Sequence, residues 1–307
     1  MERLGDLDLF LRVLDLGSIS AAARSLDLSV AVASQRLQRL ERELGVRLFQ
    51  RTTRRLHPTP EGLALAQRGR PLLEELESLD ADLRGTSGEV AGTLRVTLSA
   101  AFGRMWVSPL LPLFMARHPK LGLSTHLSDH YVDLAGEGFD LAIRMGAMED
   151  SGLVSRRIAA DRRVACASPD YLRRRGEPRT PDELAAHECL ILSGRNGRRD
   201  VWRFATPGGG ETSVRVNGRF ESNLGDFIRD ACLTGEGIGT FSYWHVAADL
   251  RAGRLRQLLP DHHLPTTYIS AVSPHRQLRL PKVRAFVDFL VEHFGDSPPW
   301  ERADDAR

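Results

Sequence analysis

Residues 18–62 limit the fold of this chain more than any other segment. Within them, Ala21–Ala23 lie in a short predicted helix, and their small side chains allow a second helix to cross close by. Asp27 and Leu28 predict a tight turn, after which Ser29 is a suitable N-cap residue for the second helix. This order of a small-residue helix, a turn and a capped helix predicts a helix-turn-helix domain.

Apolar patterns in the first 44 residues indicate two amphipathic helices, one before Gly17 and one after Ser29. Apolar residues recur in each at spacings of three and four, which places them on one helix face, toward a shared core. Gly17 is expected to end the first of these helices, and Ser18 or Ser20 to cap the short helix that follows. The core-facing residues are expected to be Leu7, Phe10, Leu11, Leu14, Ala33, Leu37, Leu40 and Leu44.

The outer face of the helix after Ser29 is predicted to be polar and cationic. Between residues 36 and 55 the chain has seven arginines and two glutamates, although its overall net charge is only +2. A solvated helix with local ion pairs to Glu41 and Glu43 would explain the charges alone, but not their combination with the helix-turn-helix pattern. Arginine and glutamine contact bases and phosphates, and the released counterions supply much of the affinity. We therefore expect DNA contacts from Ser29, Val30, Ala31, Ser34, Gln35, Gln38 and Arg39 on the helix and from Arg51, Thr52, Thr53, Arg54 and Arg55 in a β-wing.

The same segment resembles the N-terminal region of LysR-type transcriptional regulators. The matching residues are Ala21-Ala22-Ala23, Leu26, Ser29, Ser34, Leu37, Leu40-Glu41, Glu43-Leu44-Gly45, Leu48-Phe49, Arg51 and Thr59-Pro60-Glu61-Gly62. A second match, Tyr131–Leu134 with Phe139–Arg144, resembles one large bacterial subgroup of that family. The resemblance covers nearly the full length. It implies an α/β protein with an N-terminal winged helix-turn-helix, a long linker helix and a two-lobed, Rossmann-like effector domain similar to periplasmic binding proteins.

Three residues of the second helix depart from the family pattern. Members commonly carry Gln or Pro where this chain has Val30, Ser or Pro where it has Ala31, and a basic residue where it has Gln35. These positions match ones that contact bases in the family. A standard family operator is therefore not assumed for this chain.

The length of the chain is sufficient for two or three domains. We expect a DNA-binding domain over residues 1–59, a linker and dimerisation helix with a hinge over 60–88, an effector-binding domain over 89–300 and a tail over 301–307. Lobe I of the effector domain is expected over about 89–162 and 267–300 and lobe II over about 163–266, as the family's double crossover implies. The last dozen residues are expected to be frayed.

Leucines repeat through the predicted linker helix at alternating spacings of four and three, which is a heptad pattern. Thr59 and Pro60 are expected to be its N-cap and first residue. Packing against a second copy explains this pattern most simply, and packing on the chain's own effector domain is the alternative. Pro71 is expected to kink or break the helix near Gly69. The leucine seam comprises Leu65, Leu72, Leu76, Leu79 and Leu83, which are expected to form the dimer interface, with Gly69 in line with them.

Strands and helices alternate after residue 90, which predicts a parallel sheet with a binding site at the carboxyl ends of its strands. The predicted strands are 93–98, 121–127, 140–145, 163–167, 201–205, 212–220, 237–241 and 267–272, and the predicted helices are 108–118, 131–137, 181–186, 224–234 and 281–294.

The expected ligand site lies in the loops that follow these strands. Backbone amides at a helix start near Ser99 would favour a carboxylate. Ser128 matches a hydroxyl that contacts effectors in the family, and Arg144 is predicted either to pair with an anion or to form an interlobe or surface salt bridge. The expected effector-binding residues are Ser99, Ala100, Ala101, Phe102, Ser128, Asp129, Arg144, Trp202, Asn223 and Phe241.

Other classes of protein find little support in the sequence. It contains no G-x-S-x-G, H-E-x-x-H or P-loop motif, and no run of eighteen apolar residues that could span a membrane. The three widely spaced cysteines, Cys166, Cys189 and Cys232, suggest a reducing cytosol instead of a disulfide framework or zinc site. We therefore expect a cytoplasmic regulator without enzymatic activity, cofactor, metal or membrane partner.

The expected partners are double-stranded DNA, a small-molecule effector of organic-anion type and further copies of the chain, with RNA polymerase as a candidate. The family usually reaches tetramers, and the sequence leaves dimer and tetramer open, as it does activation and repression. Two alternatives remain at this point. One is an architectural DNA binder without an effector, and the other is an enzyme fused to a DNA-binding domain.

Overall fold

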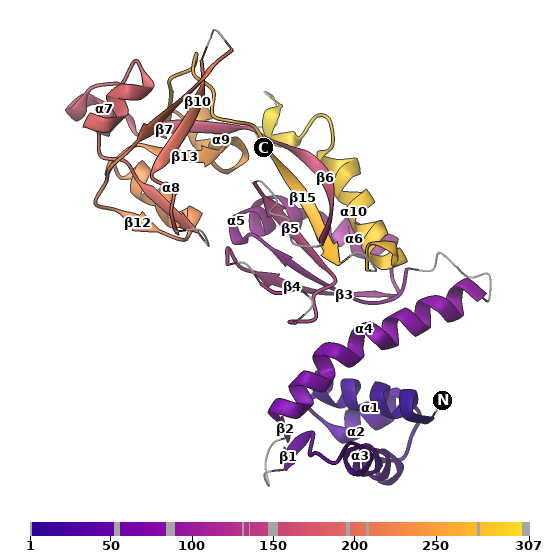
Figure 1. The fold of residues 1–307 in the computed structure, drawn as a ribbon. Helices are drawn as coiled ribbons and strands as arrows, with labels where there is room; N and C mark the ends of the chain where they lie inside the picture. Colours follow the sequence, from indigo (N-terminus) through magenta and orange to yellow (C-terminus); the bar gives the residue numbers. More distant parts are fainter. Residues whose placement is uncertain are drawn as a thin grey trace. The chain divides into compact units, whose positions relative to one another are not determined.

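The computed structural model describes residues 2–51, 56–83, 90–130, 132–134, 136–146, 153–194, 197–206, 209–274 and 277–302. The chain divides into two compact units, residues 1–89 with 133–139 and residues 90–132 with 140–307, and Figure 1 shows its elements. Each unit has a hydrophobic core of its own, as expected of separate domains.

The first unit begins with three helices, α1 (Glu2–Leu16), α2 (Ile19–Ser25) and α3 (Val30–Leu44). Local chemistry explains their ends. Gly17, with φ of 63°, follows α1 in the left-handed region, where glycine carries no steric penalty. Ser18 and Ser29 cap α2 and α3, because their hydroxyls accept hydrogen bonds from the amides of Ala21 and Val32. The predicted helix-turn-helix is thus confirmed.

The core of this unit contains most of the predicted apolar residues. Buried residues that were predicted are Phe10, Leu11, Ala33, Leu37 and Leu40, with Leu7 and Leu14 partly buried. The prediction was wrong for Leu44, the last residue of α3, which is 36% exposed. Strands β1 (Phe49–Arg51) and β2 (Leu56–Pro58) then pair antiparallel.

Helix α4 (Pro60–Leu83) runs as one 24-residue helix. Thr59 caps it, since its hydroxyl accepts a hydrogen bond from the Gly62 amide at 3.0 Å. The predicted break near Pro71 does not occur, because a proline removes only one backbone hydrogen bond and neighbouring turns can hold the helix together. A Cβ on Gly69 would lie 2.8 Å from Leu7 of α1. Gly69 therefore allows α4 to pack closely on the helix-turn-helix core.

The second unit contains a five-stranded sheet in the order β4-β3-β5-β15-β6. Its strands are β3 (Gly92–Leu98), β4 (Leu121–Leu127), β5 (Leu141–Met145), β6 (Leu153–Asp161) and β15 (Thr267–Pro274). Strand β3 pairs parallel with β4 and β5, as predicted. Strand β15 is antiparallel to both β5 and β6, and β6 was not predicted at all. We call this sheet and its helices lobe I.

Helices pack on the sheet of lobe I. A helical run follows β3 and starts at Ala100, eight residues before the helix predicted over 108–118. It comprises α5 (Ala100–Phe102), a π-helical turn (Gly103–Val107), a 3₁₀ turn (Ser108–Leu110) and α6 (Leu111–Arg117). Helix α10 (Pro281–Phe294) buries Val283, Phe286, Val287, Leu290 and Phe294 against the same core, and it lies along β15 and β6 in Figure 1. The helix predicted over 131–137 is absent from the described residues there, which form turns.

Lobe II comprises the elements between β6 and β15. Its three small sheets contain β13 (Gly239–Ser242), β7 (Arg163–Ala167) and β14 (Arg256–Leu258); β12 (Glu221–Ser222), β8 (Ile191–Gly194) and β9 (Gly197–Arg198); and the hairpin β10 (Val201–Ala205) with β11 (Glu211–Arg215). Its helices are α7 (Pro169–Arg175), a 3₁₀ helix (Pro181–Ala186), α8 (Gly225–Leu233) and α9 (Tyr243–Arg251). Neither α7 nor α9 was predicted, and β11 is shorter than the strand expected over 212–220.

The segment after α10 is part of the core, contrary to the prediction of frayed ends. Trp300 lies in the 3₁₀ turn Pro299–Glu301 and is buried. Its ring packs against Phe102, Trp106 and Phe294, with centroid distances of 5.9, 4.9 and 5.2 Å. A single indole buries enough apolar surface to fix a short segment that its prolines alone would not order.

Candidate DNA interface and effector site

The outer face of α3 is exposed in the first unit. Val30 and Val32 are 48% and 41% exposed, and Ala31, Gln35 and Gln38 are exposed as well. The Ser29 hydroxyl caps the helix at 3.2 Å from the Val32 amide, and Ser34 is half-buried. The amino-terminal turns of α3 thus present small apolar side chains, followed by two glutamines.

Arg39, which was predicted to contact DNA, forms an ion pair with another helix of its unit. Its Nη2 lies 2.6 Å from a carboxylate oxygen of Asp6 on α1. Arg36 reaches the other oxygen of the same carboxylate at 2.6 Å. Both side chains therefore join α3 to α1, and Asp6 is a residue that sequence reasoning missed. No local pattern indicates a pair separated by some thirty positions in the chain.

Glu41 has a structural role that also differs from a local ion pair. Its carboxylate accepts hydrogen bonds from the backbone amides of Leu48 and Phe49, at 2.8 and 3.3 Å. These amides lie where the connection from α3 enters β1, so Glu41 ties the start of the wing to the helix. Glu43 lies 3.8 Å from Arg3 of α1.

The wing is described only in part. Strands β1 and β2 pair with Phe49 opposite Pro58 and Arg51 opposite Leu56. The backbone of Arg51 therefore lies in the hairpin where the wing was expected. Thr52, Thr53, Arg54 and Arg55, which were predicted to contact DNA, lie outside the described residues.

The leucine seam of α4 is divided between two environments. Leu65 packs on the helix-turn-helix core, and a bidentate pair between Arg70 and Asp15 of α1, with contacts of 2.6 and 2.9 Å, holds the same part of the helix. Leu72 and Leu76 are 58% and 38% exposed. The side chains of Leu79 and Leu83 lie outside the described set. The part of α4 beyond Arg70 thus presents apolar surface that its own unit does not cover.

The predicted effector loops in lobe I lie side by side. The Ala100 amide donates a hydrogen bond to the Asp129 carboxylate at 3.0 Å. Ser128 follows β4, and its hydroxyl accepts from the His130 amide at 3.1 Å. Ser99 is the N-cap residue of α5, although its side chain makes no capping hydrogen bond. The amide at this helix start therefore holds a carboxylate of the chain itself.

Arg144 of β5 is buried beneath these loops. Its guanidinium donates to the Thr97 hydroxyl at 3.0 Å and to the carbonyl oxygens of Ser128 and His130, each at 3.3 Å. These bonds tie the loop after β4 to β3 and β5. In this structure Arg144 supports the loop after β4.

Four residues of the predicted effector site belong to hydrophobic cores. Ala101 and Phe102 pack in the core of lobe I, and Trp202 and Phe241 pack in those of lobe II. The Trp202 indole donates to the Arg199 carbonyl at 3.2 Å, so its one polar group is also satisfied. These four side chains are corrected to core positions, because burial in the folded lobe removes them from a ligand-facing surface.

Asn223 is the predicted residue of lobe II that reaches lobe I. Its amide nitrogen lies 3.2 Å from His130 Nε2. Sequence reasoning missed a second contact of this kind, in which Arg104 of the π-helical turn lies 3.6 Å from Asp226 of α8. The Asp226 carboxylate is also 2.7 Å from His245 Nε2. This hydrogen bond, with smaller contributions from Arg104 and Arg229, lowers the pKa of Asp226.

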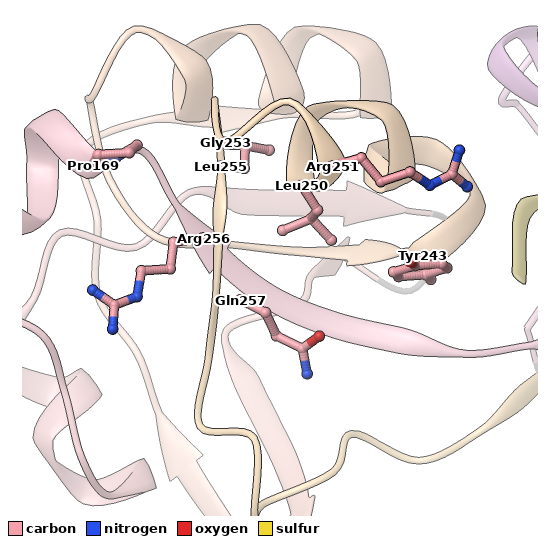
Figure 2. Close-up of a pocket in the computed structure, with 8 residues that line it drawn as sticks. All are labelled: Pro169, Tyr243, Leu250, Arg251, Gly253, Leu255, Arg256 and Gln257. Atoms are coloured by element: carbon pink, nitrogen blue, oxygen red, sulfur yellow. The ribbon is translucent and has the colours of Figure 1, made fainter. Parts of the chain in front are cut away.

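A pocket of about 520 Å³ lies on lobe II near the end of α9. Figure 2 shows Arg251 and Arg256 on opposite sides of Leu250 in this pocket. Arg251 donates to the Trp300 carbonyl at 2.9 Å and Arg256 lies 3.2 Å from Glu177. None of the predicted effector residues lines it. Its cations are thus engaged within the chain, and the pocket does not coincide with the predicted site.

The three cysteines are buried thiols. Cys166, Cys189 and Cys232 are free and buried, and burial raises the pKa of Cys189 and of Cys232 to about 12. Among the described residues, no group of three or more metal-ligating side chains comes together. Nor does any helix in the described ranges have the length and apolarity to cross a membrane.

Comparison with known proteins decides the family. The model for a bacterial regulatory helix-turn-helix protein, lysR family, matches residues 4–63, and the model for the LysR substrate binding domain matches residues 87–295. The chain belongs to the LysR family of transcriptional regulators. The predicted family and fold class are thereby confirmed.

LysR-type relatives match along nearly the whole chain. The transcriptional regulator DmlR of Escherichia coli K12 is 33% identical over 96% of this chain and 96% of its own length. CrgA of Neisseria meningitidis serogroup C is 32% identical over 95% of this chain and 97% of its own.

Solved structures of LysR-type regulators also align with nearly the whole chain. The structure of CrgA from N. meningitidis aligns with a TM-score of 0.59 over 94% of this chain and 97% of that one, at 32% identity. The full-length structure of AphB, a virulence activator of Vibrio cholerae, aligns with a TM-score of 0.57 over 94% and 99%, at 28% identity. These relatives are regulators of transcription and not enzymes, so the chain is a LysR-type regulator with a substrate-binding effector domain.

The match to the LysR substrate binding domain ends before the last core segment of lobe I. The effector-domain model ends at residue 295. The segment Pro298–Arg302, which places Trp300 in the core of lobe I, therefore lies beyond the matched region.

Proposed function

We propose that this LysR-type regulator binds specific operator sequences through the amino-terminal half of α3 and the wing between β1 and β2. The exposed outer face of α3 carries this proposal, because its side chains are short at the first turn and longer further along. Such a surface suits close approach to base edges in a major groove. The proposed contact residues are Ser29, Val30, Ala31, Ser34, Gln35, Gln38, Arg51, Thr52, Thr53, Arg54 and Arg55.

Footprinting of the upstream region of the protein's own gene tests this proposal. A protected fragment is expected to bind about 10³-fold more tightly than random duplex. If no fragment is preferred, with or without candidate metabolites, the proposed function is wrong.

The wing is tested by the salt dependence of binding. The triple variant Arg51→Ala, Arg54→Ala, Arg55→Ala should lose roughly 0.9 in log–log salt slope for each phosphate contact removed. The variant Arg203→Ala, Arg215→Ala, Arg219→Ala removes the same charge from exposed positions of lobe II and serves as the control. Equal slopes for the two variants would remove the wing from the interface.

We infer that the effector is a small organic anion bound between the two lobes. Two observations support this. The backbone amide of Ala100 already accommodates a carboxylate, that of Asp129. Arg104 and His130 of lobe I approach Asp226 and Asn223 of lobe II, so groups from both lobes meet where an anion could be held. The residues proposed to face it are Ser99, Ala100, Arg104, Ser128, Asp129 and Asn223.

A panel of mono- and dicarboxylates, with the corresponding uncharged amides, tests the effector class. At least one carboxylate is expected to raise the thermal midpoint of the protein, and its amide is not. Asn223→Ala should abolish this shift, whereas Asn217→Ala, at an exposed position of the same lobe, should keep it. An unchanged shift in Asn223→Ala would place the anion elsewhere.

We propose that two copies pair through the exposed part of α4 and that such dimers form the tetramers usual in the family. Leu72 and Leu76 support this proposal by their exposure, with Leu65, Leu79 and Leu83 as the remaining seam leucines.

The proposed division of the chain is a DNA-binding domain over 1–59, a linker over 60–88 and an effector domain over 89–300. The regulator would act in the cytoplasm, where DNA and RNA polymerase, a candidate partner, are present.

A further inference from the structure

Among the described carboxylates of the first unit, the most buried lies at the junction of α1 and the recognition helix α3. Asp6 is only 1% exposed. One of its oxygens is 2.6 Å from Arg36 Nε, and the other is 2.6 and 3.0 Å from Arg39 Nη2 and Nε. A buried charge is tolerated only when it is paired and hydrogen-bonded in good geometry. Asp6 therefore requires both guanidinium groups to stay where they are.

Gly5, the residue before Asp6, also lies against the Arg36 side chain. A Cβ on Gly5 would lie 2.5 Å from Nη2 of Arg36. The absence of a side chain at Gly5 thus leaves room for the Arg36 guanidinium against α1. Gly5 and Asp6 together form a seat for the two arginines, which we call the Asp6 seat.

The Asp6 seat has consequences for both the orientation and the charge of α3. Arg36 and Arg39 are three positions apart, so they lie on neighbouring turns of one flank of the helix. Two contacts from one fixed point on α1 to this flank resist rotation of α3 about its axis. They also engage two of the seven arginines between residues 36 and 55 in ion pairs that hold their guanidinium groups against α1.

We propose that Asp6 is a positioning residue for operator recognition. By holding Arg36 and Arg39, it sets which side chains of α3 face the bases and keeps two guanidinium groups from binding any phosphate that they could reach. Asp6 thereby raises the preference for the operator over random DNA. This inference rests on the proposed function, because it requires α3 to be the recognition helix.

The isosteric variant Asp6→Asn tests the proposal in the full-length protein. Affinities for the footprinted operator and for random duplex are measured over a series of salt concentrations. Asp6→Asn is expected to lower the ratio of the two affinities at least tenfold, with tighter binding to random duplex. The salt slope for random duplex should steepen by roughly 0.9 for each arginine that gains a phosphate.

Asp8→Asn is the matched control, because Asp8 is on the same helix and pairs with Arg12 within it, at 2.9 Å. The ratio of operator affinity to random-duplex affinity in this variant should stay within about twofold of that of the unmodified protein.

A second variant covers the case in which Asp6→Asn does not fold. Arg39→Gln keeps the contact between Arg36 and Asp6. It should lower operator affinity without changing the operator salt slope, because Arg39 contacts no phosphate in the proposed arrangement. A slope lower by about 0.9 in Arg39→Gln, or an unchanged affinity ratio in folded Asp6→Asn, would overturn the inference. Failure of the unmodified protein to prefer its operator would instead overturn the proposed function.

Discussion

The Arg104 guanidinium lies 3.6 Å from the Asp226 carboxylate, and this ion pair joins lobe I to lobe II. Arg104 belongs to a π-helical turn, a rare local structure that is frequent at functional sites. Asp226 is in the first turn of α8 and also contacts His245. An anion that entered between the lobes would compete with Asp226 for Arg104. If the effector binds as proposed, this contact would link the occupancy of its site to the relative placement of the lobes.

The pH dependence of stability provides a first prediction. Because its pKa is lowered in the folded protein, Asp226 stabilises the fold at pH values above its ordinary pKa of 3.8, and this contribution is lost as the pH falls through the folded value. Asp226→Asn should thus unfold at a lower urea concentration than the unmodified protein at pH 7, and the difference should shrink below about pH 4. Asp230→Asn, at an exposed neighbour on α8, is the control. A difference that does not depend on pH would contradict this account.

The leucines of α4 provide a second prediction. Glutamate at Leu72 and Leu76 should convert the assembly to a smaller species, because charges would have to be desolvated in an apolar interface. Leu63→Glu is the matched control, since Leu63 is similarly exposed and lies on the opposite face of α4 by helical geometry. Sedimentation velocity measures the result. An intact dimer in the double variant, or dissociation of the control, would show that the seam is not the interface.

The helix-turn-helix could be predicted from the sequence because the residues that determine it act locally. The N-caps Ser18 and Ser29 and the small residues of α2 act within one or two turns of themselves. The pair between Asp6 and Arg39 could not be read in this way, since nothing near either residue indicates the other. The prediction for Arg39 therefore did not include its contact with Asp6.

The effector site was harder to predict because burial is decided by the folded lobe. Phe102 follows directly after residues at a strand-end loop, yet its ring is enclosed by Trp244, Phe294 and Trp300. These partners lie far along the chain, and two of them are in segments that the sequence did not identify as structured. By contrast, Asn223 was among the predicted residues of lobe II, and it reaches lobe I. Its partner His130 was not predicted.

The reactivity of the cysteines provides a third prediction. A thiol reacts as its thiolate, and burial raises the pKa of Cys166, Cys189 and Cys232. At pH 8 the native protein should therefore give no rapid reaction with an aromatic disulfide reagent, and all three thiols should react in guanidinium chloride. Ser213→Cys, at an exposed position of β11, is expected to react at once and serves as the control. Rapid modification of a thiol in the native, unmodified protein would contradict the burial described here.

The last prediction concerns Trp300, which lies beyond the family match and inside the core of lobe I. Trp300→Ala removes an indole that contacts Phe102, Trp106 and Phe294, so it should destabilise the protein by about 3–5 kcal/mol. Arg302→Ala, at an exposed position of the same segment, should change stability by less than about 0.5 kcal/mol. Urea unfolding followed by circular dichroism measures both, since the far-ultraviolet signal is dominated by the backbone. Equal stabilities for the two variants would mean that the segment covers the core without supporting it.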